Sequence, residues 1–224
     1  MRRNNIKAIC QIRKNGELCN LVILVIAILV GSIVELVFRS TDTGDATPYR
    51  DVIAGALAYG YVLVNIFVKV FIQADEVPRG LCFGMTRKVL FGYSRIADFL
   101  EIAVFAIIVS LVSVSVATIT VFKIAIIVFG LIMWIEATAG NGMLRYGKVV
   151  YWIYYICFLL IMIGGPRLIG EATGMSDATA HLVDMIINPF YNQLPVWIGI
   201  MAFAVAGLVV NWITFRKIPV NVSI

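Results

Sequence analysis

The sequence predicts an all-α integral membrane protein with six transmembrane helices and both termini in the cytoplasm. Of its 224 residues, 61% are hydrophobic, and the mean hydropathy is +0.96, whereas soluble domains contain about 45–50% apolar residues. Only 14% of the residues are charged, and these cluster between long apolar segments. A soluble domain of this composition would expose much apolar surface to water, so lipid is the solvent that fits it. We therefore treat residues 1–224 as a single transmembrane domain.

Six apolar segments are long enough to cross a membrane, because a helical span needs about 20 mostly apolar residues. They are residues 20–38, 52–73, 97–117, 121–138, 149–166 and 194–215. The third and fourth need a turn between them, because one helix over residues 102–135 would be about 51 Å long, too long for one crossing. We place this turn in SVSVATITVFK, where β-branched residues and Lys123 suit a hairpin at the membrane surface.

The N-terminal segment, residues 1–19, is basic, and the apolar run after it is longer than the core of a signal peptide. It predicts either an amphipathic helix on the membrane surface, to which Ile6 and Ile12 contribute, or a solvated tail. Near the other end of the chain, residues 170–193 are too long for a simple turn, and Ser176 could cap a helix from Asp177 to Ile187. This segment predicts either a re-entrant external helix before the sixth span or a plain extracellular loop.

Basic residues set the orientation, since cytoplasmic loops carry an excess of Lys and Arg. Thirteen lie on one side of the six spans: Arg2, Arg3, Lys7, Arg13, Lys14, Arg79, Arg87, Lys88, Arg95, Arg145, Lys148, Arg216 and Lys217. Four lie on the other side: Arg39, Arg50, Lys123 and Arg167. This bias places both termini in the cytoplasm and accounts for the net charge of +5 without nucleic acid as a partner. Cys10, Cys19 and Cys82 then face the reducing side and Cys157 lies within a span, so no disulfide is expected.

Residues for catalysis or cofactor binding are not evident. GMLRYGKV, residues 142–149, resembles a phosphate-binding loop, but Val149 replaces the Ser or Thr that holds Mg²⁺, and no strand is predicted before it. His181 is the only histidine, so neither a metal-hydrolase motif nor a nucleophilic triad is predicted. We expect no catalytic, metal or cofactor site in this chain.

Four acidic residues lie within or beside the predicted spans: Glu35, Asp98, Glu101 and Glu136. A charge at the centre of a bilayer costs about 2.5–3.5 kcal/mol on insertion scales, and such a charge usually serves transport. These four lie near the ends of their spans instead. We favour roles at the membrane surface or in helix pairing over ion coupling.

One cytoplasmic loop carries the functional interpretation. Between the second and third spans the chain reads EVPRGLCFGMTRKVLFGYSRIADFLEI, and its FGMTRKVLFGYSR resembles the coupling segment of ATP-binding-cassette (ABC) exporter permeases. It is closest to the small six-span, ABC-2-like permeases of Gram-positive bacteria, whose G-x-[ST]-R-[KR] turn is matched by Gly84, Met85, Thr86, Arg87 and Lys88. LRYGKVVYW (residues 144–152) and FRKIPV (residues 215–220) resemble two further features of the family.

The resemblance implies a cytoplasmic coupling helix within residues 80–93 that lies along the membrane in a groove of a separate ABC ATPase subunit. Arg87 and Lys88 would reach acidic groups of the ATPase, while Val89, Leu90 and Phe91 would face the spans. It also implies a second permease chain, identical or different, a re-entrant external helix, and the bacterial cytoplasmic membrane as the location. ATP and Mg²⁺ would bind only the partner ATPase, so this chain is not itself an enzyme.

The function expected from this resemblance is ATP-driven export of an amphipathic peptide, an antimicrobial compound or a lipid. Two alternatives stay open. One is a non-transporting membrane immunity or sensor subunit, and the other is a secondary transporter, which would need inverted repeats and broken helices. Lys88 and its neighbours would then only enforce topology and bind anionic lipid.

Overall fold

The computed structural model describes residues 2–40, 49–171, 180–181, 183–188 and 190–218. These residues form helices joined by turns, with no β-strand among them, so the predicted all-α fold is confirmed. The principal helices are α1 (Arg2–Ser40), α2 (Tyr49–Cys82), α3 (Arg87–Val112), α4 (Thr118–Ile135), the π-helix η1 (Glu136–Gly140), α5 (Asn141–Tyr146), α6 (Lys148–Glu171) and α8 (Gln193–Phe215).

The helices support a multi-pass membrane protein. Four stretches are long and apolar enough to cross a membrane: Cys10–Val37, Tyr49–Cys82, Thr118–Tyr146 and Gln193–Phe215. Helix α3 is long, but its N-terminal and middle parts carry Arg95, Asp98 and Glu101. Helix α6 is apolar over Lys148–Leu160, the part whose side chains are described. Six spans therefore stay a prediction, of which four have direct support.

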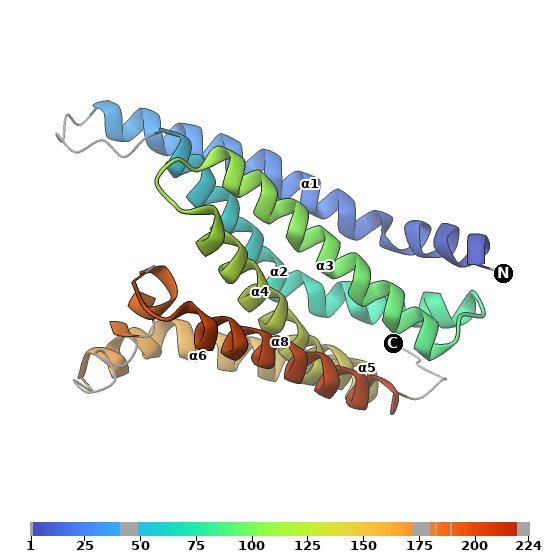
Figure 1. Ribbon diagram of the computed structural model, residues 1–224. Helices are drawn as coiled ribbons and strands as arrows, with labels where there is room; N and C mark the ends of the chain where they lie inside the picture. Colours follow the sequence, from blue (N-terminus) through green and yellow to red (C-terminus); the bar gives the residue numbers. More distant parts are fainter. Residues whose placement is uncertain (1, 41–48, 172–179, 182, 189, 219–224) are drawn as a thin grey trace.

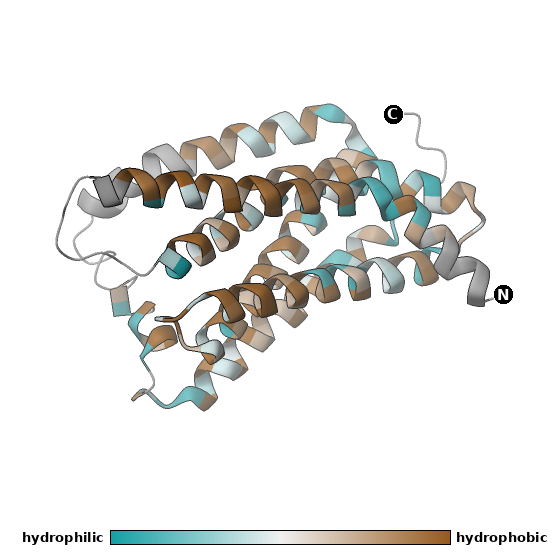
Figure 2. Cartoon of the chain, turned by 90° about the horizontal axis from the view of Figure 1, so that it is seen from above, coloured by the Kyte–Doolittle hydropathy of each residue, from teal (hydrophilic) through white to brown (hydrophobic). Residues whose placement is uncertain are grey.

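The bundle has two distinct ends. The start of α1, the turn between α2 and α3, and the end of α8 lie at one end, on the right of Figure 1. The turn between α3 and α4 lies at the opposite end. Figure 2 shows mostly hydrophobic residues along the helices between these ends. The start of α1 and the end of α8 therefore lie at the same end of the bundle.

Of the two predictions for the N-terminal segment, the solvated tail is wrong, because α1 is one continuous helix of 39 residues that begins at Arg2. Whether this part of the helix lies on a membrane surface stays a prediction. Its N-terminal part packs into the bundle, where Ile12 is 4% exposed and Arg13 is 6% exposed. The side chain of Ile6 lies outside the described residues. The basic residues suggested a surface segment, whereas the packing of Ile12 and Arg13 holds this part of α1 against its neighbours.

The turn between α3 and α4 is shorter than predicted and covers residues 113–117. Asp51 of α2 fixes it by accepting hydrogen bonds from the backbone of Val114 (2.7 Å) and from the hydroxyls of Ser113 (2.8 Å) and Ser115 (2.5 Å). Lys123 does not lie in this hairpin, contrary to the prediction. It belongs to α4, where its side chain is buried.

The predicted coupling helix along the membrane is also corrected. Helix α2 continues to Cys82 and α3 begins at Arg87, so only the tight turn of residues 83–86 separates them. Two local features cause this: Gly84 adopts a positive φ of 74°, which glycine tolerates without steric cost, and Thr86 caps α3 by accepting a hydrogen bond from the N–H of Val89. Both helices therefore extend as far as the turn.

The external segment before α8 is described in part. Ser176 and Asp177 lie outside the described residues, whereas residues 183–187 are helical and end at the predicted Ile187. The ammonium group of Lys123 donates to the carbonyl of Ile186 at 2.8 Å and also contacts the amide oxygen of Gln193. The segment is thus attached to α4. Whether it re-enters a membrane stays a prediction.

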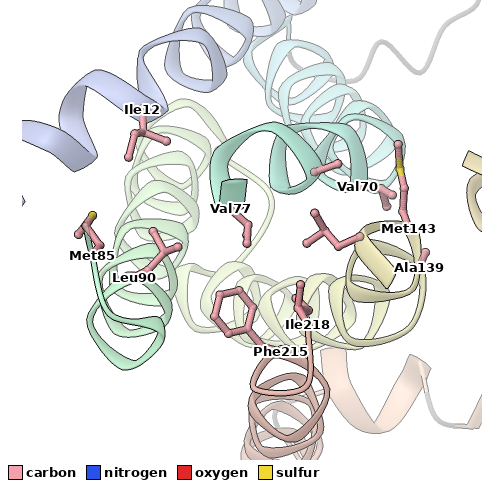
Figure 3. Close-up of a cluster of buried hydrophobic side chains, with 11 residues drawn as sticks. Ile12, Val70, Val77, Met85, Leu90, Ala139, Met143, Phe215 and Ile218 are labelled. Atoms are coloured by element: carbon pink, nitrogen blue, oxygen red, sulfur yellow. The ribbon is translucent and has the colours of Figure 1, made fainter. Parts of the chain in front are cut away.

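A cluster of buried apolar side chains supports the turn between α2 and α3. Figure 3 shows its residues converging from several helices: Ile12, Val70, Ala74, Val77, Met85, Leu90, Ala139, Met143, Leu144, Phe215 and Ile218. Leu90 packs so closely on α2 that a Cβ atom at Gly80 would lie 2.5 Å from its Cδ1. Met85 and Leu90 pack into this cluster and therefore hold the turn firmly on the bundle.

Candidate functional site

Charged side chains meet inside the bundle where α1, α2 and α3 pack together. Arg13 of α1 donates to Asp98 at 2.7 Å and to Glu101 at 3.0 Å. Lys69 of α2 donates to the same two carboxylates, at 3.0 Å and 2.8 Å. All four side chains are at most 7% exposed. Each carboxylate therefore bridges two cations from two different helices.

Helical spacing explains why these groups meet. On α3, Asp98 and Glu101 are three residues apart and share one face, as does Arg95 one turn earlier. On α2, polar residues recur every three or four positions: Tyr61, Asn65, Lys69, Gln73 and Glu76. Two members of this stripe reach α3: Lys69, as above, and Tyr61, whose hydroxyl donates to Glu101 at 2.6 Å.

Arg95 extends the network to the second half of the chain. Its guanidinium pairs with Asp98 at 3.3 Å and with Glu136, the first residue of η1. Glu136 also accepts a hydrogen bond from the amide of Asn211 in α8 at 3.1 Å. Because π-helical turns inside α-helices often occur at functional sites, the position of Glu136 in η1 marks this junction as a candidate.

Amide side chains complete the network. Asn141 of α5 donates to Asn211 at 2.9 Å, and Gln73 of α2 donates to Asn141 at 2.8 Å. Through Gln73 these hydrogen bonds lead back to α2, the helix that carries Lys69. We name these residues, together with the buried Glu76 of the same stripe on α2, the ion network: Arg13, Tyr61, Lys69, Gln73, Glu76, Arg95, Asp98, Glu101, Glu136, Asn141 and Asn211.

The ion network can act as a mechanical and electrostatic connection. Breaking a buried ion pair by removing one partner costs about 3–5 kcal/mol, because the other charge is left without compensation. Helices α1, α2, α3, η1, α5 and α8 are tied by such contacts or by hydrogen bonds to them. A displacement of α2 and α3 therefore strains, or re-pairs, the charges that hold α1 and α8.

The residues predicted to contact an ATPase lie on the turn of residues 83–86 and the first turn of α3. Met85 is buried, and Gly84 and Thr86 shape the turn as described above. Arg87 donates to the backbone carbonyl of Arg216 at 2.5 Å, so it joins α3 to the end of α8. Lys88 is exposed. Of the two basic residues, Lys88 thus has the freer side chain.

An aromatic residue that the sequence analysis did not single out stands at the same turn. Phe83 is 55% exposed, immediately before Gly84 and at the end of the bundle that holds Lys88 and Arg216. Aromatic residues, Phe included, are enriched at protein interfaces. From sequence, the position of Phe83 directly before Gly84 in a predicted loop could have indicated that its side chain is exposed.

The structure assigns helix pairing to three of the four acidic residues considered from sequence. Asp98, Glu101 and Glu136 are ion-paired inside the bundle, which confirms that interpretation. Glu35 is buried in α1. Sequence reasoning missed Arg13 and Arg95 as network members because it counted them as cytoplasmic basic residues, and it counted Lys69, near the end of the second predicted span, on neither side. The polar stripe on α2 could have revealed Lys69.

The segment that resembles a phosphate-binding loop has a helical context. Residues from Asn141 to Tyr146 form α5, Gly147 turns with a positive φ of 81°, and α6 begins at Lys148. The π-helix η1 precedes the segment. A strand–loop–helix cradle is therefore not formed at residues 142–149.

Apolar helices and a buried ion network together define a multi-pass α-helical membrane protein. Comparison of the chain with protein-family models, with curated proteins and with solved structures found no match. Its function must therefore be inferred from its own residues.

Proposed function

We propose that the chain is the permease subunit of an ATP-driven exporter, and that the turn of residues 83–86 docks on a separate ABC ATPase. The observation that carries the proposal is the construction of this turn. The turn exposes Phe83, and the first turn of α3 exposes Lys88. Met85 of the turn and Leu90 of α3 are buried in the apolar cluster and anchor both segments. A docking element has to be stiff, because a flexible loop would absorb the displacement that it receives.

The ion network gives the turn a route to the rest of the bundle. Lys69 lies on the helix that enters the turn, and Arg95 and Asp98 lie on the helix that leaves it. A push on Phe83 by a closing ATPase dimer moves α2 and α3 together. The buried ion pairs pass this movement to Arg13 on α1 and, through Glu136, to Asn211 on α8.

The cargo class follows from the resemblance of FGMTRKVLFGYSR to exporter permeases and is an amphipathic peptide, an antimicrobial compound or a lipid. The proposal includes a second permease chain, surrounding membrane lipid and the bacterial cytoplasmic membrane, with both termini inside. ATP and Mg²⁺ bind the ATPase. This chain supplies the docking turn and the path through the membrane.

Site-specific crosslinking tests the docking assignment. A photoreactive amino acid replaces Phe83 in the full chain, expressed in its native cells, and the crosslinked product is identified by mass spectrometry. The control places the same photoreactive residue at Leu111, which is 70% exposed near the far end of α3. We expect a crosslink to an ABC ATPase from position 83 and none from position 111. Absence of an ATPase from the position 83 product rejects the docking role.

Charge reversal at Lys88 tests the electrostatic part. Losing a hydrogen bond to a charged group costs about 1.5–3 kcal/mol, so Lys88→Glu should weaken ATPase binding about 10- to 100-fold. The matched control is Lys14→Glu, which reverses an exposed lysine in the N-terminal part of α1. Equal binding by the two variants at equal expression would show that Lys88 serves topology alone.

A secondary transporter is the second candidate, and the buried ion pairs favour it, because intramembrane charges often line ion pathways. The two candidates differ in their energy source. Export from proteoliposomes that contain this chain and no ATPase, driven by an imposed proton or sodium gradient, supports the secondary transporter. Export that requires both ATP and the ATPase supports the exporter.

A further inference from the structure

The charged side chains of the ion network do not balance. Its cations are Arg13, Lys69 and Arg95, and its acids are Glu76, Asp98, Glu101 and Glu136, all at most 9% exposed. With every group ionised, three positive charges face four negative charges. Burying an uncompensated charge is very costly, and among the described side chains the network lacks one positive charge.

Glu76 is the acid that lacks compensation. Asp98, Glu101 and Glu136 each take part in ion pairs. Glu76 is 8% exposed, and its Oε1 has no hydrogen-bond partner among the described residues. This oxygen points toward α1, where it lies 3.8 Å from the position that a Cβ atom at Gly16 would take.

The neighbouring cations are already engaged. Arg13 uses one terminal nitrogen for Asp98 and Glu101 and the other for the carbonyl of Ser94. Lys69 is held by Asp98 and Glu101. The charged groups around Glu76 are Arg13 on α1, Lys69 on its own helix, and Arg95 and Asp98 on α3. The Nε atom of Arg13 also lies 3.8 Å from the exposed carboxylate of Glu17. None of the cations among them has its ion pair with Glu76.

From the excess of one carboxylate and from the unpartnered, buried oxygen of Glu76, we propose that Glu76 is a proton-binding site of the ion network and holds a proton at neutral pH in the folded protein. The proton binds a carboxylate oxygen and makes the side chain neutral, so the remaining three acids match the three cations. This inference does not depend on the exporter proposal, because it rests only on the charges inside the bundle.

Proton release has a structural consequence. It leaves a further carboxylate group near Arg13, in competition with Asp98 and Glu101 for the same guanidinium. Because Arg13 is the contact that holds the N-terminal part of α1 to α3, release of the proton loosens or shifts that part of the helix. The site thus couples pH to the position of α1.

Infrared spectroscopy of the full chain in lipid nanodiscs tests the proposal. A protonated carboxyl group gives a carbonyl stretching band that an ionised carboxylate lacks. We expect this band in the wild type at neutral pH and its loss as the pH is raised. Glu76→Gln should remove the band, whereas Glu17→Gln, at a glutamate that is 56% exposed, should retain it. Absence of the band from the wild type, or its persistence in Glu76→Gln, overturns the proposal.

Thermal unfolding in the same nanodiscs gives an independent measurement. The folded state holds a proton that the unfolded chain releases at neutral pH, so the melting temperature of the wild type should fall as pH rises. Glu76→Gln, which resembles the neutral side chain, should flatten this dependence. An equal slope in both proteins contradicts the proposal. Stabilisation of the wild type by sodium ions, without a carboxyl band, would assign the site to a metal cation and also overturn it.

Discussion

Asp98 is the residue on which the ion network depends most. One of its oxygens accepts from Arg13 at 2.7 Å and from Lys69 at 3.0 Å, and the other pairs with Arg95 at 3.3 Å. Asp98→Asn keeps the shape of the side chain and removes its charge. Breaking a buried pair in this way costs about 3–5 kcal/mol. Glu101 still holds two of the three cations, so we expect the lower limit, about 3 kcal/mol, or roughly a 100-fold change in the folding equilibrium.

The control is an exposed ion pair on the neighbouring helix. Asp75 and Arg79 lie 2.9 Å apart with both side chains 49% exposed, and exposed pairs contribute about 0–1 kcal/mol. Asp75→Asn should therefore change stability by less than about 1 kcal/mol. The assay is unfolding of the full chain in mixed micelles by increasing detergent denaturant, followed by tryptophan fluorescence.

A compensating variant separates charge from packing. Lys69→Met combined with Asp98→Asn removes one cation and one anion together, so it should recover part of the loss caused by Asp98→Asn alone. Similar costs for Asp98→Asn and Asp75→Asn would refute the view that buried charges hold this bundle. If the double variant loses more unfolding free energy than the two single variants lose together, the charge-balance argument is refuted.

Three further predictions use other parts of the chain. Gly84→Ala should destabilise the protein by about 1–2 kcal/mol because Gly84 has a φ of 74°. Gly92→Ala, in open space within α3, should instead stabilise it by about 0.5–1 kcal/mol. Unfolding in mixed micelles measures both changes in stability, and changes of the same sign would contradict the turn geometry. Cys10 and Cys82 are exposed and should react with a membrane-impermeant maleimide only after cells are permeabilised, so labelling in intact cells would reverse the orientation. Lys148→Ala should leave the nucleotide affinity of the purified complex unchanged in a fluorescent-ATP titration, and a clear loss would restore residues 142–149 as a nucleotide site.

The sequence was a good guide to the helices and a poor one to their contacts. Apolar runs of about 20 residues identify helices because lipid requires every backbone hydrogen bond to be made internally. The turn near Ser113 was also placed correctly, since serines and β-branched residues interrupt the apolar run there. The exact ends differ, because helix ends depend on caps such as Thr86 and on bonds such as those of Asp51.

The ion network was missed for a physical reason. Counting Lys and Arg by side assumes that each one is solvated, but Arg13, Arg95 and Lys123 are buried. Which acid each cation meets depends on how the helices cross, and no local pattern contains that information. Removing the first two from the basic side and Lys123 from the other side leaves the same orientation. Assuming that every Lys and Arg is solvated therefore leaves the predicted orientation unchanged, but it hides the cations of the ion network.

The coupling segment shows a different limit. Gly84 was expected to permit a tight turn, and its positive φ confirms this. The separate helix was wrong because Thr86 starts α3 directly after the turn. Arg87 and Lys88 were treated alike from sequence, whereas Arg87 bonds to the end of α8. Adjacent residues on a helix point in different directions, so equal charge did not mean equal surroundings.

The π-helix η1 places a constraint on the length of the chain as well as on its residues. A π turn closes over five residues rather than four, so η1 contains one residue more than an α-helix would need to cover the same turn. Each residue of an α-helix rotates the next by about 100°. Loss of a single codon within Glu136–Gly140 would let the segment become α-helical and would rotate α5, carrying Asn141 away from Asn211 and Gln73. In this segment, deletion of one residue should therefore disturb the packing more than most single substitutions.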